Sequence, residues 1–313
     1  MNRGPTAPIL VAIDTAQTVE DAVDWAAAEA ATQSSPLRIV HAIAPEFCLD
    51  PYIASAVFEY TAGTRAAAKL LLQDAAARAT SVAPELEVTT ALLDGTVTWA
   101  LRREARAARL LVVGNHHHRH RGLRALLGSS VVAELAAHAP CPVVVLCHQD
   151  GPVAGAARVV VGVNRGPSSA AIGFGFHAAR QREIPLTLVH VCRSAPHRDR
   201  TGAGVDLPTF IEALDDPAVV QAITRWQEEC PEVRVSPRLC AGEPAAALIA
   251  ESVGAALLVV GSRGRSSRVR RLRGSVSQVA LDQATCPLAI IGQDHATNAP
   301  ADDARRPEVH SAR

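Results

Sequence analysis

Apolar and polar residues follow one another in blocks that predict a repeated strand–helix pattern. Short continuous apolar runs are typical of strands buried on both faces, and the longer Ala-rich segments between them have helical periodicity. In the first half the runs are residues 9–13, 37–43, 86–92, 110–113 and 142–146. In the second half they are residues 158–163, 185–191, 232–239, 256–260 and 287–291. This alternation predicts βαβ units, parallel sheets and right-handed crossovers.

The segments between the strands differ in how clearly they predict structure. Residues 19–31 and 65–79 are Ala-rich and favour helices. Residues 44–62 and 193–210 show no clear period, so we expect irregular insertions after the second strand of each half. From residue 293 onward the chain is polar and contains two prolines, which predicts a disordered tail.

The chain contains an internal duplication. Four blocks recur in the same order at offsets of 150, 149, 147 and 145 residues. The paired blocks are 9–14 with 159–164, 37–41 with 186–190, 110–114 with 257–261, and 139–145 with 284–290. We therefore expect two α/β domains, at residues 1–150 and 151–292, followed by a tail at residues 293–313. We also expect the two domains to pair along their final strands.

Composition narrows the function classes. Hydrophobic residues make up 48% of the 313 residues but aromatic residues only 3%, which fits a core of aliphatic side chains. Thirty-one basic residues balance 31 acidic ones, so no overall field favours nucleic acid or a membrane surface. Seven cysteines without a Cys-x-x-Cys pair, no signal sequence and no long apolar segment predict a cytoplasmic protein with reduced thiols.

A glycine-rich segment after the fourth strand of the second half carries the clearest chemistry. Gly261 and Gly264 are followed, after nine residues, by Gly274 and Ser275, where a helix is expected to begin. Glycines let backbone N–H groups approach a bulky anion, and a helix N-terminus favours negative charge. Six arginines in this segment, including Arg263 and Arg265, suit a polyphosphate.

The ends of the first and fourth strands should lie beside this segment. In an open parallel sheet, ligands bind at the carboxyl ends of the strands where the strand order reverses. This places Asn164 opposite Gly261 in the second half and Asp14 opposite Gly114 in the first. A side-chain acceptor at that position suits ribose hydroxyls or the edge of a base.

At these residues the chain resembles the ATP-binding branch of the universal stress protein family, in a tandem arrangement. The family spacing of Gly, two residues, Gly, nine residues, Gly and Ser or Thr is matched throughout by Gly261, Gly264, Gly274 and Ser275. The resemblance implies two doubly wound α/β domains, each a five-stranded parallel sheet of order 3-2-1-4-5 with helices on both faces. It also implies binding of ATP with Mg2+ and a role in stress or dormancy. The expected nucleotide-binding residues are Asp14, Gly114, Gly128, Ser129, Gly162, Asn164, Gly261, Ser262, Arg263, Gly264, Arg265, Gly274, Ser275 and Val276.

The two copies depart from the family pattern at different positions. The acidic residue after the first strand is Asp14 in the first copy, whereas the second copy has Asn164. The first copy has His117 at the second glycine position and carries Gly128 and Ser129 one residue late. It also has Ala12 where the second copy keeps Gly162. One or two nucleotides per chain are therefore both compatible with the sequence.

Several other motifs have more than one interpretation. The cluster His116, His117, His118 and His120 is either a metal site or an exposed loop that helps to hold phosphate. The arginine run lacks the interleaved aromatic residues of a nucleic-acid surface. Gly173 and Gly175 lie too far from their strand for a dinucleotide fingerprint and predict helix packing. We expect Cys141 and Cys286, together with Trp25, Trp99 and Trp226, to be core residues.

Three functions remain open. The first is a regulatory protein that senses adenine nucleotide without turning it over, acting as a homodimer or through a regulatory protein partner. The second is a weak ATPase or nucleotidyl transferase, although neither loop offers a lysine or a carboxylate that would position an attacking water. The third is a nucleotide-free interaction module whose two sites have eroded.

Overall fold

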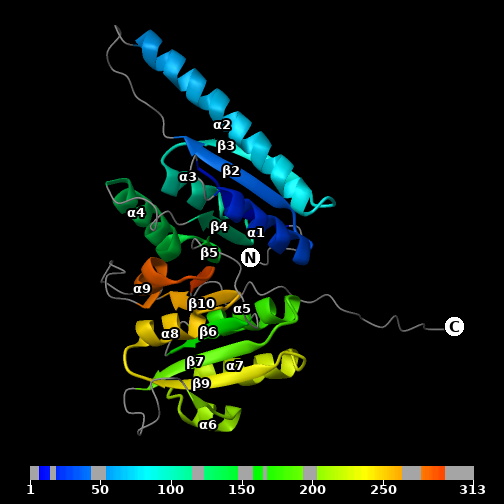
Figure 1. Cartoon of the computed structure of the whole chain (residues 1–313), viewed down its shortest axis with the longest axis vertical. Coiled ribbons are helices and arrows are strands. Elements are labelled where there is room, and N and C mark those ends of the chain that lie inside the picture. The colour runs from blue at the N-terminus through cyan, green and yellow to red at the C-terminus, as the bar shows by residue number, and fades with distance from the viewer. Residues whose placement is uncertain are drawn as a thin grey trace, which may run out of the picture.

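In a computed structural model of the chain, the described residues form two connected halves. These residues are 7–14, 19–43, 54–114, 123–146, 158–164, 168–192, 203–262 and 276–292. Within them, eleven strands join in one continuous sheet, drawn from top to bottom in Figure 1.

The described elements of the first half alternate strand and helix as the apolar pattern predicts. They are β1 (Ile9–Ala12), α1 (Val19–Thr32), β2 (Leu37–Ile43), α2 (Ala54–Val82), β3 (Val88–Asp94), α3 (Val97–Glu104), β4 (Leu110–Gly114), α4 (Leu123–His138) and β5 (Val143–Leu146).

The second half repeats this order with two additional elements, a short strand and a short helix, after its second strand. Its described elements are β6 (Val159–Val163), α5 (Ser168–Gln181), β7 (Leu186–Cys192), β8 (Ala203–Gly204), α6 (Leu207–Glu212), α7 (Pro217–Glu229), β9 (Val235–Ala241), α8 (Pro244–Ser252), β10 (Leu257–Ser262), α9 (Val276–Gln283) and β11 (Leu288–Gly292).

The strand order of both halves is the expected one. The whole sheet reads β3-β2-β1-β4-β5-β11-β10-β6-β7-β9-β8, which gives 3-2-1-4-5 in the first half and the same order, reversed, in the second. The second half differs in that β8 pairs antiparallel with β9 as an additional edge strand. The halves join where β5 runs antiparallel to β11, with Val144 opposite Ala289. The expectation that the two final strands pair is confirmed, and the two sheets are in fact one.

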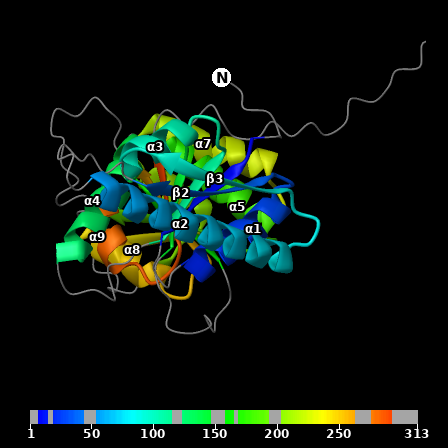
Figure 2. The same ribbon diagram turned by 90° about the horizontal axis from the view of Figure 1, so that it is seen from above.

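Helices cover both faces of the sheet, and each layer runs through both halves (Figures 1 and 2). One apolar cluster packs α1, α2, α5 and α7 against the sheet. The other cluster packs α3, α4, α8 and α9 against the opposite face. Because each cluster contains residues from both halves, the apolar core is continuous across the junction.

Three helices of the second half begin with the same kind of cap. The carboxylates of Asp206, Asp216 and Glu243 accept hydrogen bonds from backbone N–H groups in the first turns of α6, α7 and α8, at 2.9, 3.0 and 2.9 Å. Each helix also has proline in its first turn, where no N–H is needed. These caps satisfy backbone donors that have no partner inside the helix.

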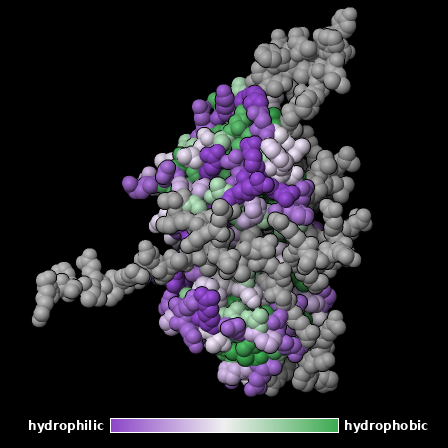
Figure 3. Space-filling model, turned by 180° about the vertical axis from the view of Figure 1, so that it is seen from behind, coloured by the Kyte–Doolittle hydropathy of each residue, from purple (hydrophilic) through white to green (hydrophobic). Residues whose placement is uncertain are grey.

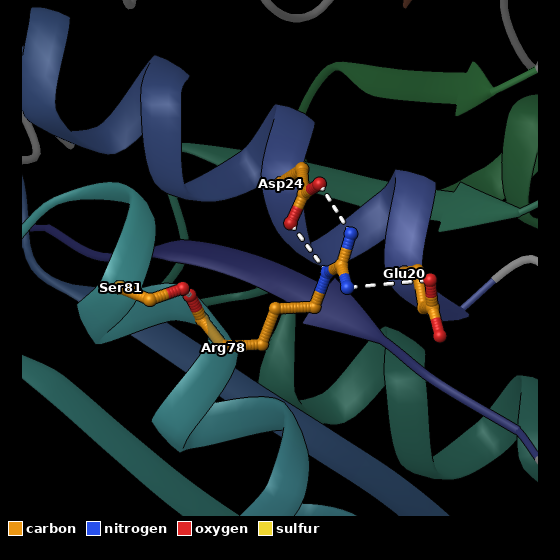
Figure 4. A network of polar contacts seen from close by, with 4 residues as sticks. All are labelled: Glu20, Asp24, Arg78 and Ser81. Carbon is orange, nitrogen blue, oxygen red and sulfur yellow. Dashed lines mark hydrogen bonds and ion pairs between the residues drawn. The ribbon is translucent and has the colours of Figure 1, made fainter.

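A charged network fastens α2 to α1 (Figure 4). Arg78 of α2 donates from Nε and Nη2 to the two carboxylate oxygens of Asp24, both at 2.6 Å. Its Nη1 lies 3.2 Å from Oε2 of Glu20. The hydrogen bond with Asp24 raises the pKa of Arg78 above its ordinary value. This paired geometry fixes the direction in which α2 crosses α1.

A second polar contact joins the two halves. Glu29 of α1 is buried and pairs with Arg182, which follows α5 in the second half. The Arg182 guanidinium also lies 5.9 Å from the ring centre of Trp25 and donates to the carbonyl of Ala178 at 3.1 Å. Gln33 donates to the other carboxylate oxygen of Glu29 at 2.5 Å. The halves therefore meet through an ion pair as well as through paired strands.

The expectation of irregular insertions was wrong where these segments are described. Residues 54–62 form the first turns of α2, which Figure 1 shows extending beyond the sheet. In the other insertion, residues 203–204 form β8 and residues 207–212 form α6.

Several predicted core residues are confirmed, and one is corrected. Cys141 and Cys286 are buried, and burial raises the pKa of the Cys286 thiol to about 11. Trp25 and Trp226 pack against the core. Trp99 is 55% exposed instead, because the wide ring lies along the surface over Gly95 and beneath the guanidinium of Arg103.

The two glycines of α5 serve helix packing, as predicted. A Cβ at Gly173 would lie 2.7 Å from Nε1 of Trp226, and one at Gly175 would lie 2.3 Å from Cγ2 of Val161 in β6. Only hydrogen side chains let α5 approach both the strand and α7 this closely.

Some expectations concern residues that the structure does not describe. The domain boundary near residue 150 and the tail from residue 293 both lie outside the described residues. Among the helices that are described, none has the length and apolar character needed to cross a bilayer. Figure 3 shows hydrophilic and hydrophobic residues interspersed over the described surface of the back face.

Candidate functional site

The first half brings its predicted strand-end residues together. In the sheet, Ala12 of β1 lies beside Val113 of β4. Asp14 follows β1 by two residues, and Gly114 is the last residue of β4. Both therefore lie at the carboxyl edge of the sheet. At this edge β1 has β2 as its neighbour on one side and β4 on the other, so the strand order reverses there.

A pocket opens at this point of the first half. It has a volume of about 190 Å³, and Asp14, His41 and Gly114 contribute to its wall. The remaining lining is apolar and comes from both faces of the sheet, with Ala22 of α1 on one side and Leu135 of α4 on the other. Ligand pockets usually measure roughly 300–1,000 Å³. The pocket that the described residues form is therefore smaller than this usual range.

His41 is a pocket residue for which we predicted no role. Its Nδ1 lies 2.8 Å from the carbonyl oxygen of Ile13, the residue before Asp14. The N–H of Ile13 donates to the carbonyl of Val40 at 2.9 Å, so this peptide is held from both sides. The missed signal was the recurrence of histidine at the same repeat position, as His190.

The second half has the same strand-end arrangement with different side chains. Asn164 follows β6 and is exposed, and its backbone N–H donates to Oγ of Ser168 at 2.8 Å. Gly261 and the buried Ser262 end β10, the neighbouring strand. Asn164 and Gly261 therefore share one sheet edge, as predicted.

The alanine-to-glycine difference between the copies has a steric consequence. A Cβ at Gly162 would lie 2.9 Å from Cδ1 of Leu248 in α8. Leu248 occupies the repeat position of Leu101, which lines the first-half pocket above Ala12. In the second half the Leu248 side chain thus packs directly onto Gly162. At the equivalent position the first half has the methyl group of Ala12.

The loops that would hold phosphate lie outside the described residues. This applies to five of the predicted binding residues, namely Arg263, Gly264, Arg265, Gly274 and Ser275. It also applies to the histidines at positions 116, 117, 118 and 120. Among the residues that are described, no group of three or more His, Cys, Asp or Glu side chains is arranged to hold a metal ion.

The described helices after these loops include different parts of the repeat. α9 is described from Val276 onward, directly after Ser275, which itself lies outside the described residues. α4 begins at Leu123, so Gly128 and Ser129 lie inside the helix and not at its start. An amide group within a helix is already bonded to a carbonyl four residues earlier, which leaves it less available to an anion.

Comparison with known proteins identifies the family. The sequence profile described as "Universal stress protein family" matches residues 6–146 and, a second time, residues 156–292. This chain belongs to the universal stress protein family. Its two matched segments make it a tandem universal stress protein.

Known relatives of this tandem universal stress protein span nearly its whole length. A universal stress protein of Mycolicibacterium smegmatis is 32% identical over 295 residues, covering 90% of this chain and 96% of the relative. One of Mycobacterium tuberculosis is 29% identical over 291 residues, covering 90% and 95%. The crystal structure of a universal stress protein from Archaeoglobus fulgidus has a TM-score of 0.67 at 15% identity, covering 93% of this chain and 98% of that one. That structure supports the fold.

Proposed function

We propose that this universal stress protein binds ATP, accompanied by Mg2+, as a nucleotide-sensing regulator of a stress response. The observation that carries the proposal is the first-half pocket at the carboxyl ends of β1 and β4, which is the expected ligand position in a doubly wound sheet. Its apolar lining suits a base, and the Asp14 carboxylate suits ribose hydroxyl donors.

The phosphates would extend from this pocket toward the glycine-rich segments. In the second half the sequence spacing of Gly261, Gly264, Gly274 and Ser275 supports a polyphosphate ligand. Mg2+ prefers oxygen ligands and is commonly held through substrate phosphates, so it would arrive with ATP. Binding that orders the loops would change the surface offered to a second copy or to a regulatory partner.

We propose binding without dedicated turnover. Asp14 and His41 are the titratable residues among those that line the pocket, and neither loop sequence contains lysine or a carboxylate to position an attacking water. The test is to denature freshly purified protein, identify any released nucleotide by chromatography, and titrate nucleotide-free protein with ATP and MgCl2 in a calorimeter.

The expected result is ATP binding with turnover slower than roughly one per minute, a rate far below the 1–10³ per second typical of enzymes. Absence of released nucleotide together with absence of binding heat would refute the proposal. It would favour a nucleotide-free interaction module, for which the enclosed position of Gly128 and Ser129 in α4 and the packing of Leu248 onto Gly162 are the structural motives.

A further inference from the structure

The two outer edges of the sheet differ between the halves. In the second half the short strand β8 pairs antiparallel with β9, with Ala203 opposite Leu239, and so covers that edge. In the first half β3 is the outermost strand, and no described residue pairs with its outer side. One end of the sheet is therefore covered, whereas the other ends in a strand that has a single described neighbour.

The hydrogen bonds of β3 show which of its backbone groups face outward. The carbonyl of Glu87 accepts from the N–H of Leu37 at 2.8 Å, and the N–H of Gly95 donates to the carbonyl of Ile43 at 3.1 Å. Both bonds run toward β2, and alternate residues of a parallel strand bond the same neighbour. The residues whose N–H and C=O groups face away from β2 are therefore Val88, Thr90, Leu92 and Asp94. Such a row of backbone groups is a template for a further strand.

The equivalent strand of the second half is also closed by its sequence. The registers of β3 and β9 against their neighbours put Pro237 at the repeat position of Thr90. Proline has no N–H to offer at an edge, and the carbonyl of Pro237 accepts from the N–H of Val205 at 3.2 Å. Thr90 is exposed and keeps its outward N–H. The first half thus has neither of the two features that close the edge of the second.

An exposed aromatic side chain lies at the end of β3. Trp99 of α3 is 55% exposed, and its ring lies against Gly95, where a Cβ would be 2.9 Å from Cε3 of the ring. The guanidinium of Arg103 lies 4.8 Å from the ring centre. Figure 2 looks onto this end of the sheet and shows β3 with α3 on one side and α2 on the other. Trp99 and Arg103 therefore form an apolar and basic surface beside the end of the edge strand.

The charges beside this edge are opposite at its two ends. Glu87 is exposed at the start of β3, and Arg102 and Arg103 of α3 follow its end, with 42% and 46% of their side chains exposed. Side chains alternate between the faces of a strand, and Leu93 packs in the cluster that contains α3. Glu87 is six residues from Leu93 and so belongs to the face of α3 as well. One face of the edge thus has an acidic start and a basic end.

We propose that β3 is the interface through which two copies of this chain associate, with the two β3 strands antiparallel about a two-fold axis at Ala91. A two-fold axis applies the same surface twice, so one strand supplies both sides of the interface. With the axis at Ala91, all of the outward-facing residues of β3 find partners. The opposed residues are Val88 with Asp94 and Thr90 with Leu92 of the second copy. The halves of one chain already join by antiparallel pairing, through β5 and β11.

The same register joins the opposite charges. Glu87 of one copy comes to lie opposite Gly95 of the other, on the face that carries Trp99 and Arg103. The carboxylate then meets a guanidinium beside the exposed ring. Asp94 is the charged residue of β3 and pairs with Arg65 of α2 in its own chain. Antiparallel strands keep the two acidic starts apart, whereas a parallel pair would place them together, so charge selects the antiparallel arrangement.

The natural proline of the second half provides the test of the backbone contact. Thr90→Pro should raise the dissociation constant of the dimer at least about tenfold, because it removes an outward N–H and adds a ring at the edge. It removes no bond to β2, since the N–H of Thr90 faces away from that strand. Thr90→Val keeps the N–H and is the matched control, which should associate like the wild type. Sedimentation velocity of the full-length proteins over a range of concentrations measures association, and thermal melting shows that each variant folds.

A charge exchange tests the antiparallel direction. Glu87→Arg and Arg103→Glu should each raise the dissociation constant by about tenfold, because each places like charges together. The double variant restores opposite charges across the interface and should recover most of the affinity, which a misfolded protein would not do. Arg225→Glu, on the exposed surface of α7 in the second half, is the control and should leave association unchanged.

Hydrogen exchange examines the edge in the unaltered chain. The N–H groups of Val88, Thr90, Leu92 and Asp94 should exchange rapidly in dilute protein and slowly at concentrations where the dimer forms. A chain that stays monomeric at every concentration, with or without another protein bound to β3, refutes the proposal. A dimer that Thr90→Pro leaves intact refutes it too, as does protection of these four groups that is the same at all concentrations.

Discussion

At the scale of single residues, burial decides the chemistry of the cysteines. Cys286 precedes β11, is 1% exposed, and has apolar neighbours on the inner side of α9. Loss of water around the thiolate raises its pKa to about 11, and hydrogen bonds with Ser252 and the backbone of Leu258 oppose this rise only in part. The thiol is therefore a neutral core group and a poor nucleophile at physiological pH.

This gives a pH dependence of stability with a defined sign. Above the ordinary thiol pKa near 9.0 the unfolded chain releases the proton, whereas the folded chain keeps it until about pH 11. The free energy of unfolding should therefore fall as pH rises from 9 to 11, by on the order of 2 kcal/mol from this group. Urea unfolding at pH 7 to 10 of the wild type and Cys286→Ala measures it, since the variant lacks this part of the decline. Equal slopes in both proteins would contradict the assignment.

At the scale of elements, the contact between α1 and the end of α5 combines burial with charge. Glu29 is 5% exposed, so its carboxylate depends on Arg182 and Gln33 for partners. Arg182 comes from the other half and also lies over the ring of Trp25. Removing one member of such a pair leaves a buried charge without compensation, which destabilises more than the pair itself stabilises.

We therefore expect Arg182→Ala to lower the free energy of unfolding by roughly 2–4 kcal/mol. Denaturant unfolding followed by circular dichroism measures the change. The matched control is Arg225→Ala, because Arg225 pairs with Glu229 on an exposed helix surface and should contribute less than about 1 kcal/mol. Adding Glu29→Gln to Arg182→Ala should recover part of the loss, and no recovery would count against the buried charge as the cause.

The packing of each element explains whether the sequence could predict it. The strands of both halves were predicted within a few residues because parallel strands buried on both faces are continuous apolar runs. β8 has only two residues, and α6 is six residues long, so neither shows a period. The cap Asp206 followed by Pro208 is the signal that could have located α6.

The candidate site was predicted less completely than the sheet. Strand-end positions such as Asp14 and Gly114 follow from topology alone, since all carboxyl ends of a parallel sheet lie at one edge. His41 was not recognised, because its contact with the carbonyl of Ile13 joins neighbouring strands, and the sign of that contact in the sequence is the recurrence of histidine at position 190. The prediction that Trp99 is a core residue was wrong because a helical position does not show where a large ring will pack. Such a ring can enter an apolar core, or it can lie on the surface between a glycine and an arginine, as Trp99 does.

At the scale of the whole molecule, the duplication produces one folded unit and not two independent ones. The antiparallel pairing of β5 with β11 makes the sheet continuous, and both apolar clusters cross the junction. Unfolding one half would expose the paired edge and the shared apolar surface of the other. The described structure therefore predicts that the halves unfold together.

Two tryptophans allow this to be measured separately in each half. A Trp99→Phe/Trp226→Phe variant keeps Trp25 in α1 as its reporter, and a Trp25→Phe/Trp99→Phe variant keeps Trp226 in α7. Fluorescence and circular dichroism should give coincident denaturant midpoints within each variant. A fluorescence midpoint that departs from the circular dichroism midpoint in either protein would show that the halves unfold as separate units.

The position of α4 links the site of one half to the backbone of the other. α4 contributes the wall of the first-half pocket through Val131, Val132 and Leu135, and it packs against β11, which belongs to the second half. A ligand in this pocket would contact α4, the same helix that packs against the junction between the two halves. The proposed occupancy of the first pocket should therefore be linked to any ligand binding by the second half, and by reciprocity each ligand would alter the other's binding free energy by an equal amount.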